Sequence, residues 1–180
     1  MAKQKKRIIL TGAQGVGKTT LMNALAADGT KTLSIAREQA IEAGWASVTG
    51  SSEDYQKTLF KVLHKALSSK RNYISDRGLT CVAAYTFLGA IDGEITKDVA
   101  NKQYGKIQKF HAENPDALLV YIPIEFPIEE DGVRDANPEN QERMDFLIKN
   151  LLDATGVNYI TVTGTVEERV KQIEDALAKI

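Results

Sequence analysis

Short apolar runs alternate along the chain with longer stretches in which apolar residues recur every three or four positions. The runs at 8–10, 32–35, 73–75, 117–122 and 159–162 predict strands, and the unbroken run at 117–122 is typical of a strand buried on both faces. The stretches at 21–25, 36–44, 53–67, 80–88, 96–113, 138–152 and 166–177 predict helices. Strands that alternate with helices pair in parallel through right-handed crossovers, so the pattern predicts a three-layer α/β sandwich.

Capping residues support two of these helices. Asn137-Pro138 reads as an N-cap with proline at the first helical position, and Thr165 with Glu168 fits a capping box. Gly89 opens a Gly-Ala-Ile-Asp-Gly segment that is interpreted as the end of the helix at 80–88.

The first apolar run leads directly into a glycine-rich loop. Residues 12–19 read Gly-Ala-Gln-Gly-Val-Gly-Lys-Thr, a complete G-x-x-x-x-G-K-T motif between a predicted strand and a predicted helix. The glycines let backbone N–H groups converge on a phosphate, Lys18 can reach the β- and γ-phosphates, and the Thr19 hydroxyl can ligate Mg²⁺. The motif predicts a nucleotide-binding P-loop formed by Gly12, Ala13, Gln14, Gly15, Val16, Gly17, Lys18, Thr19 and Thr20.

Composition narrows the setting. The 180 residues, with 43% hydrophobic and 26% charged, suit one domain over residues 1–180. A net charge of -1 argues against a nucleic-acid partner, because duplex binding needs many Lys and Arg residues. The basic cluster at 3–7 is interpreted as the solvated start of the first strand.

No apolar run approaches the ~20 residues of a membrane span, and none follows the basic start as in a signal peptide. The lone Cys81 is expected to be a buried thiol. We therefore expect a cytoplasmic protein without a membrane partner. The amphipathic helices leave a homodimer open.

A P-loop indicates the ligand but not the fate of its γ-phosphate. GTPases select guanine with Asn-Lys-x-Asp, whereas the Asn-Lys at 101–102 lacks the Asp and lies within a predicted helix. ATP-driven motors usually end a long apolar strand with Asp-Glu, whereas the run at 117–122 leads into Pro-Ile-Glu. The remaining option is phosphoryl transfer to a small acceptor, which needs a group near the acceptor and cations for the in-line transition state.

Asp76 and Arg77 follow the short strand at 73–75. The P-loop sits at the same carboxyl edge of the sheet, so Asp76 can orient or deprotonate an acceptor there, or hold a Mg²⁺-bound water. Arg77 can bind an acceptor phosphate. Alternatively, Asp76 caps the helix that begins near Gly78, and Arg77 pairs on the surface.

These residues also carry a family resemblance. Asp76-Arg77-Gly78-Leu79, followed by Ala83-Ala84-Tyr85, resembles the D-R-x and later A-Y segment of thymidylate kinases. It also resembles the D-R-G…A-Y segment of the small P-loop family that contains the ribosylnicotinamide kinase domain of NadR. The segment at 130–134, the later Arg143 and the segment at 162–169 are similar to that family's D-G-x-R, distal Arg and V-x-G…R pattern.

The resemblance covers nearly the whole chain in order. It implies a P-loop NTPase fold, a three-layer α/β/α sandwich with a central, mostly parallel five-stranded sheet. It also implies a nucleoside or nucleotide kinase that uses ATP and Mg²⁺, with a lid at 123–143 that closes over the phosphates.

By position, Arg134 and Arg143 would be lid cations that stabilise the negative charge on the transferring phosphoryl group. Alternatively, both are surface residues: Arg143 stands four residues after Glu139 on one helix face, and Arg134 lies between Asp131 and Asp135.

The acceptor side departs from the family in one place. The segment at 33–38 resembles the family's stretch after the second strand, where a Glu commonly precedes an Ala-Arg pair by two positions, but Ser34 stands there. Arg37 and Glu38 remain candidates for acceptor binding, although Glu38 also suits the first turn of a helix. Stacking on an acceptor base, or core packing, would suit Tyr85, Trp45 and Phe60.

The sequence therefore predicts ATP-dependent phosphoryl transfer to a small nucleoside or nucleoside monophosphate. The predicted catalytic residues are Lys18, Asp76, Arg134 and Arg143; the acceptor residues are Arg37, Asp76, Arg77 and Tyr85; and the Mg²⁺ ligands are Thr19 and Asp76. The alternative is a P-loop ATPase or nucleotide-sensing regulatory module, without a small-molecule acceptor, that signals through the loop at 123–137.

Overall fold

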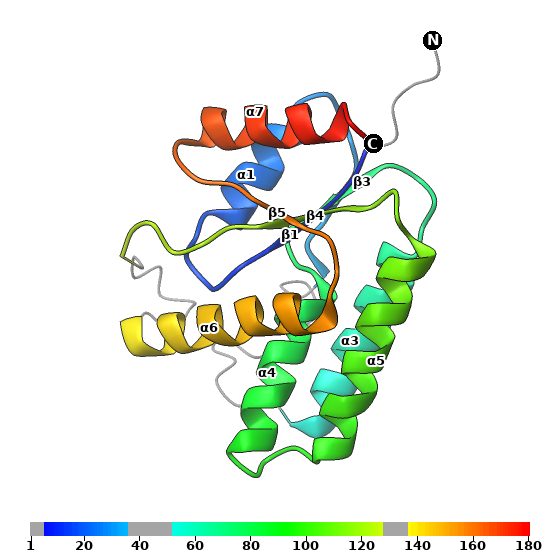
Figure 1. Cartoon of the computed structure of the whole chain (residues 1–180), viewed down its shortest axis with the longest axis vertical. Coiled ribbons are helices and arrows are strands. Elements are labelled where there is room, and N and C mark those ends of the chain that lie inside the picture. The colour runs from blue at the N-terminus through cyan, green and yellow to red at the C-terminus, as the bar shows by residue number, and fades with distance from the viewer. Residues whose placement is uncertain (1–5, 36–51, 128–136) are drawn as a thin grey trace.

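A computed structural model of the protein describes residues 6–35, 52–127 and 137–180 (Figure 1). The strands are β1 (Arg7–Thr11), β2 (Thr32–Leu33), β3 (Tyr73–Ser75), β4 (Leu118–Tyr121) and β5 (Ile160–Thr161). The helices are α1 (Lys18–Leu25), α3 (Glu53–Leu67), α4 (Leu79–Ile91), α5 (Lys97–Glu113), α6 (Pro138–Thr155) and α7 (Val166–Leu177).

The strands form one parallel sheet in the order β2-β3-β1-β4-β5. Figure 1 shows α1 and α7 on one face, and α3, α4, α5 and α6 on the other. Every residue of β1, β3 and β4 is buried, as a parallel sheet covered on both faces requires. The predicted three-layer α/β/α sandwich with a five-stranded parallel sheet is confirmed.

The edge strands are shorter than the sequence predicts. The apolar runs at 32–35 and 159–162 contribute two strand residues each, Thr32–Leu33 and Ile160–Thr161. Each edge strand pairs with one neighbour, β2 with β3 and β5 with β4. The length of an edge strand is therefore limited by the stretch over which this single neighbour runs beside it.

The helix α4 continues past the expected break at Gly89 and ends at Ile91. Gly89 is buried, and its carbonyl oxygen accepts from the amides of Glu94 (2.8 Å) and Ile95 (3.0 Å). A Cβ atom at Gly89 would lie 2.7 Å from Cδ1 of Ile95. The glycine therefore permits close packing of the following turn and does not end the helix.

The predicted caps are present. The Asn137 side chain accepts from the amide of Glu139, and Thr165 and Glu168 form a reciprocal capping box. Cys81 is buried as expected.

Arg7 corrects the prediction of a solvated start to the first strand. Its side chain is fully buried and donates to Asp116 (2.6 Å), Asn114 (2.8 Å) and the carbonyl oxygen of Leu67 (3.1 Å). A buried guanidinium is tolerated because these acceptors replace its water.

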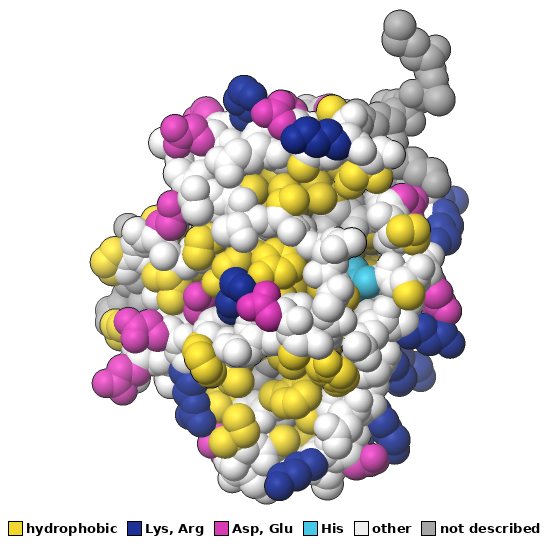
Figure 2. Space-filling model, in the orientation of Figure 1, with side chains coloured by type: hydrophobic (Ala, Val, Ile, Leu, Met, Phe, Trp, Pro, Cys, Tyr) yellow, Lys and Arg dark blue, Asp and Glu magenta, His cyan; other side chains and the backbone are white. Residues whose placement is uncertain are grey.

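Charged side chains of both signs lie mainly around the rim of the face shown in Figure 2. Hydrophobic side chains reach the surface between α6 and the sheet and between α4 and α5. None of the helices in the described ranges is both long and apolar enough to span a membrane.

Candidate functional site

The glycine-rich loop connects the end of β1 to the start of α1, as the motif predicts. Gly12 has a φ of +152°, and a Cβ atom there would lie 2.4 Å from the carbonyl oxygen of Ile122, just after β4. Gly17 has a φ of +87° and is the N-cap of α1. Only glycine suits the first position, because backbone from the neighbouring strand closes against it.

The Lys18 ammonium lies across this loop. It donates to the carbonyl oxygen of Gly12 at 2.9 Å and also to that of Ala13. These carbonyl contacts hold the positive charge over the loop, where the motif requires a cation for the phosphates.

Two buried side chains from distant helices hold the loop backbone. Gln141 of α6, 2% exposed, donates to the carbonyl oxygen of Gln14 at 2.8 Å. Arg169 of α7, 3% exposed, donates to the carbonyl oxygen of Val16 at 2.9 Å and pairs with Glu125. The loop is therefore positioned by tertiary contacts in addition to its own glycines.

Sequence reasoning assigned no role to either side chain. Arg169 entered only as part of a family segment, and Gln141 was not considered. The available signal for Gln141 is its spacing: it extends the apolar stripe of Met144 and Ile148 back by one helical turn, where a polar residue needs a buried partner.

Replacing Gln141 with Leu is expected to lower the free energy of unfolding by about 1–3 kcal/mol, because the Gln14 carbonyl loses its donor. Nucleotide should bind several-fold more weakly, because the loop is less well positioned. Chemical denaturation and calorimetric titration with ATP measure the two effects.

The matched control is Gln103→Leu, a buried glutamine of α5 that contacts the carbonyl oxygen of Gln56 at 3.5 Å. This variant should lose stability without losing affinity. Equal affinity losses in both variants would contradict a specific role for Gln141.

Asp76 lies at the same edge of the sheet as the loop. It follows Ser75, which pairs with Ile9 of β1, and is 7% exposed. The N-cap of α4 is Gly78, and no side chain caps this helix. The alternative role for Asp76 as a helix cap is therefore not observed.

The start of α4 is joined to the end of β1 beside the loop. The Thr11 hydroxyl lies 3.1 Å from the Thr80 hydroxyl and 2.9 Å from the Cys81 sulfur. The turn 76–78, which leads into α4, is thereby held close to the first residue of the phosphate loop.

Arg77 and Tyr85, both predicted on the acceptor side, are brought together. The Arg77 guanidinium lies 5.9 Å from the centre of the Tyr85 ring, a cation–π geometry. Tyr55 of α3 lies within electrostatic reach of Arg77, and burial raises the pKa of its hydroxyl. The structure therefore places a cation and two aromatic rings together in the region predicted to bind an acceptor.

The structure gives no acceptor role to Phe60, and it does not describe the remaining acceptor candidates. Phe60 is 3% exposed and belongs to the hydrophobic core, so core packing explains it. Arg37, Glu38 and Trp45 lie outside the described residues, together with the helical pattern at 36–44.

Of the two predicted lid cations, only Arg143 lies within the described residues, and its observed partner is not in the loop. Arg143 is half exposed and pairs at 3.2 Å with Asp92, at the C-terminal end of α4. The packing of α6 on α4 supplies this partner, so the ion pair is with Asp92 and not with the expected Glu139. Arg134 lies outside the described residues. Both lid roles stay predictions.

Asp145 of α6 lies near the loop and is not among the residues that the sequence predicts for the site. The Tyr121 hydroxyl, at the end of β4, donates to its Oδ2 at 2.8 Å. Burial raises the pKa of the Asp145 carboxyl, and the nearby Lys18 charge partly opposes this shift. Its signal in the sequence is its spacing from Gln141, four residues earlier on the same helix face.

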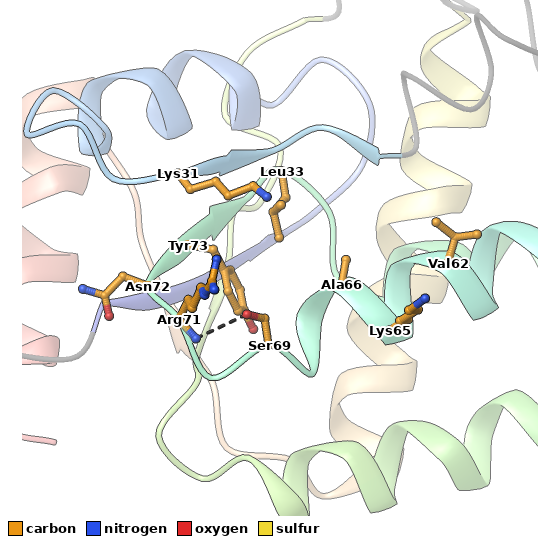
Figure 3. Close-up of a pocket in the computed structure, with 9 residues that line it drawn as sticks. All are labelled: Lys31, Leu33, Val62, Lys65, Ala66, Ser69, Arg71, Asn72 and Tyr73. Carbon is orange, nitrogen blue, oxygen red and sulfur yellow. Dashed lines mark hydrogen bonds between the residues drawn. The ribbon is translucent and has the colours of Figure 1, made fainter.

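A cavity of about 540 Å³ opens beside the loop. Its lining comes from Gly17 and Thr20, from Glu125 and Phe126 after β4, and from the turn into α7 with Gly164 and Arg169. A second cavity of about 410 Å³ lies near the amino ends of β2 and β3 (Figure 3). Its nine lining residues include three cations and no carboxylate, and none comes from the loop.

Comparisons with known proteins agree with this geometry. A protein-family model described as an AAA domain matches residues 7–169. No significant match to a curated protein is found.

Several solved structures share the fold. NadR in complex with NAD and AMP-PNP superposes with a TM-score of 0.68 at 16% identity, over 98% of this chain and 49% of that chain. Deoxyadenosine kinase from M. mycoides, with dCMP and dCDP bound, gives 0.64 at 14% identity, over 96% and 98%. Shikimate kinase from Acinetobacter baumannii, in complex with shikimate, gives 0.51 at 14% identity, over 97% and 94%.

The chain therefore spans about half the length of the NadR structure. The fold is that of P-loop kinases, as the sequence resemblance to the NadR-containing family predicts.

Proposed function

The chain belongs to the AAA domain family over residues 7–169, and we propose that it is an ATP-dependent kinase acting on a small nucleoside or nucleoside monophosphate. The observation that carries this proposal is the shared sheet edge. There the buried Asp76 and Arg77 directly follow β3, the strand next to the one that leads into the phosphate loop, and Tyr85 of α4 lies against Arg77. A hydrolase needs only the loop and a water, whereas this arrangement adds groups suited to a second substrate.

On the donor side, the Gly12–Thr19 loop holds the triphosphate, and Lys18 exchanges its carbonyl contacts for phosphate oxygens. The cavity beside Gly17 and Thr20, about 540 Å³, is placed to receive the base of the nucleotide. Phe126 in its lining is 44% exposed, which leaves aromatic surface available to that base.

The residues at this edge fit a Mg²⁺ ion. Thr19 and Asp76 offer hydroxyl and carboxylate oxygens, and Mg²⁺ is usually held by one or two carboxylates together with substrate phosphates. A cluster of three or more His, Cys, Asp or Glu residues is absent from the described part of the chain, but such a site does not need one. Bound Mg²⁺ would neutralise charge on the phosphates.

On the acceptor side, Asp76 orients the attacking hydroxyl and takes its proton as the oxygen bonds to the γ-phosphorus of ATP. ADP leaves with its β-phosphate held by Lys18. For a monophosphate acceptor, a phosphate oxygen attacks and Arg77 binds the acceptor phosphate. The Tyr85 ring limits the positions that Arg77 can take. Arg134 and Arg143 would add positive charge when the segment 123–143 closes.

An acceptor screen tests this function. The purified chain is incubated with Mg²⁺, ATP labelled at the γ-phosphate and a panel of nucleosides and nucleoside monophosphates, and the products are identified by mass spectrometry. We expect label in one class of acceptor. Label in free phosphate alone, whatever the acceptor, would favour the P-loop ATPase or nucleotide-sensing module.

A further inference from the structure

The carboxylate of Asp145 lies near the phosphate loop, and the proposed mechanism gives it no role. Its Oδ2 accepts from the Tyr121 hydroxyl, but its Oδ1 is buried and has no hydrogen-bond partner among the described residues. An unsatisfied buried carboxylate oxygen is costly. Such a group persists where a nearby charge compensates it.

The compensating charge is the Lys18 ammonium. Tyr121, which donates to Asp145, pairs with Thr11 at the end of β1, and Gln141, one turn earlier on α6, holds the loop backbone, so Asp145 lies beside the loop that carries Lys18. Among the described residues, Lys18 is the cation whose charge acts on the Asp145 carboxylate. The basic residues on the same helix are engaged elsewhere: Arg143 pairs with Asp92, and Lys149 pairs with Asp153. Asp145 therefore acts on the lysine that the phosphates require.

Bound phosphate changes this balance. A triphosphate brings several negative charges to Lys18 and so toward Asp145, where low surrounding dielectric strengthens repulsion. The carboxylate also loses part of the attraction of Lys18, because the ammonium turns to phosphate oxygens. Both effects oppose binding of the phosphate tail, and neither affects the base.

We propose that Asp145, held by Tyr121, is a positioning residue that competes with the nucleotide phosphates for Lys18 and thereby weakens nucleotide binding and speeds ADP release. This inference rests on the proposed function, since it requires the loop to bind phosphates. Asp145 would thus lower nucleotide affinity in a site whose other groups, hydrogen-bond donors and cations, raise it.

The test compares wild-type protein with Asp145→Asn by calorimetric titration with MgADP and with inorganic tripolyphosphate. Removing the negative charge of Asp145 should lower the Kd of both ligands by about tenfold, because one partly screened repulsion between this carboxylate and the phosphates is lost. The ADP dissociation rate, measured by stopped flow, should fall by a similar factor. Asp145→Ala, which removes the same charge with a different shape, should act in the same direction.

The matched control is Asp153→Asn. Asp153 lies two turns later on α6 and is exposed, with Lys149 and Tyr159 as partners. The Kd values of Asp153→Asn should equal those of the wild type. If Asp145 had a purely structural role, its variants would lower the melting temperature without tightening tripolyphosphate binding.

The outcomes separate the two proposals. Equal or weaker binding by both Asp145 variants overturns the role of Asp145 and leaves the kinase proposal standing. Failure of every variant and of the wild type to bind ADP, ATP or tripolyphosphate overturns the proposed function and the inference with it. Tighter binding of the polyphosphate by both Asp145 variants supports the competition.

Discussion

Lys18→Ala is expected to lower the rate of phosphoryl transfer on the order of 100- to 1,000-fold, because it removes a cation aimed at the transferring phosphate. Affinity for ATP should fall as well, because Lys18 contacts the phosphates in the bound state as well as in the transition state. The fold should survive, since Lys18 lies outside the hydrophobic core.

Steady-state kinetics with the acceptor found in the screen measures the loss, and thermal unfolding checks the fold. Lys171→Ala is the matched control, because Lys171 is an exposed lysine of α7 paired with Asp175. It should retain full activity. Turnover by Lys18→Ala within a few-fold of the wild type would remove the basis of the donor-side assignment.

Asp76→Asn is expected to lower kcat on the order of 100- to 10,000-fold, the range found when a positioned proton acceptor is removed. The amide keeps the size of the side chain but cannot take the acceptor proton. Because we also place Mg²⁺ beside Asp76, the Mg²⁺ concentration that gives half-maximal rate should rise. Binding of ATP without the acceptor should change much less.

The kinetic comparison uses Asp98→Asn as its control, an exposed carboxylate of α5 that pairs with Lys102. This variant should behave as the wild type. If Asp76→Asn retained full kcat and an unchanged Mg²⁺ requirement, Asp76 would have neither proposed role. A nucleoside monophosphate acceptor would make the kcat loss smaller than for a hydroxyl acceptor, since its phosphate oxygen needs no deprotonation.

The features that could be predicted from the sequence are those formed by residues close together in the chain. The phosphate loop spans eight positions, 12–19, and its glycines, lysine and threonine are interpretable together. The caps at Asn137 and Thr165 are local in the same sense, since each side chain reaches an amide two or three residues away. The exception is Gly89, which reads locally as a helix end but serves the packing of Ile95.

The partners of polar side chains were the least predictable part. A helix pattern suggested Glu139 for Arg143, because that pairing needs only one turn of helix. The observed partner, Asp92, is 51 positions earlier in the chain and comes into reach because α6 packs on α4. The solvated interpretation of Arg7 was wrong for the same reason: its acceptors lie 60 to 109 positions away.

By itself, the sequence determined the parallel α/β architecture, the phosphate loop and the placement of Asp76 and Arg77 at the end of a strand. Hydrophobic periodicity and a contiguous motif are sufficient for these, since both act over a few residues. Only the tertiary structure decided that Gln141, Asp145 and Arg169 surround the loop. The hydrogen bonds of Gln141 to Gln14 and of Arg169 to Val16, and the electrostatic interaction of Asp145 with Lys18, join residues more than 120 positions apart. Such interactions form only when helices pack on a completed sheet.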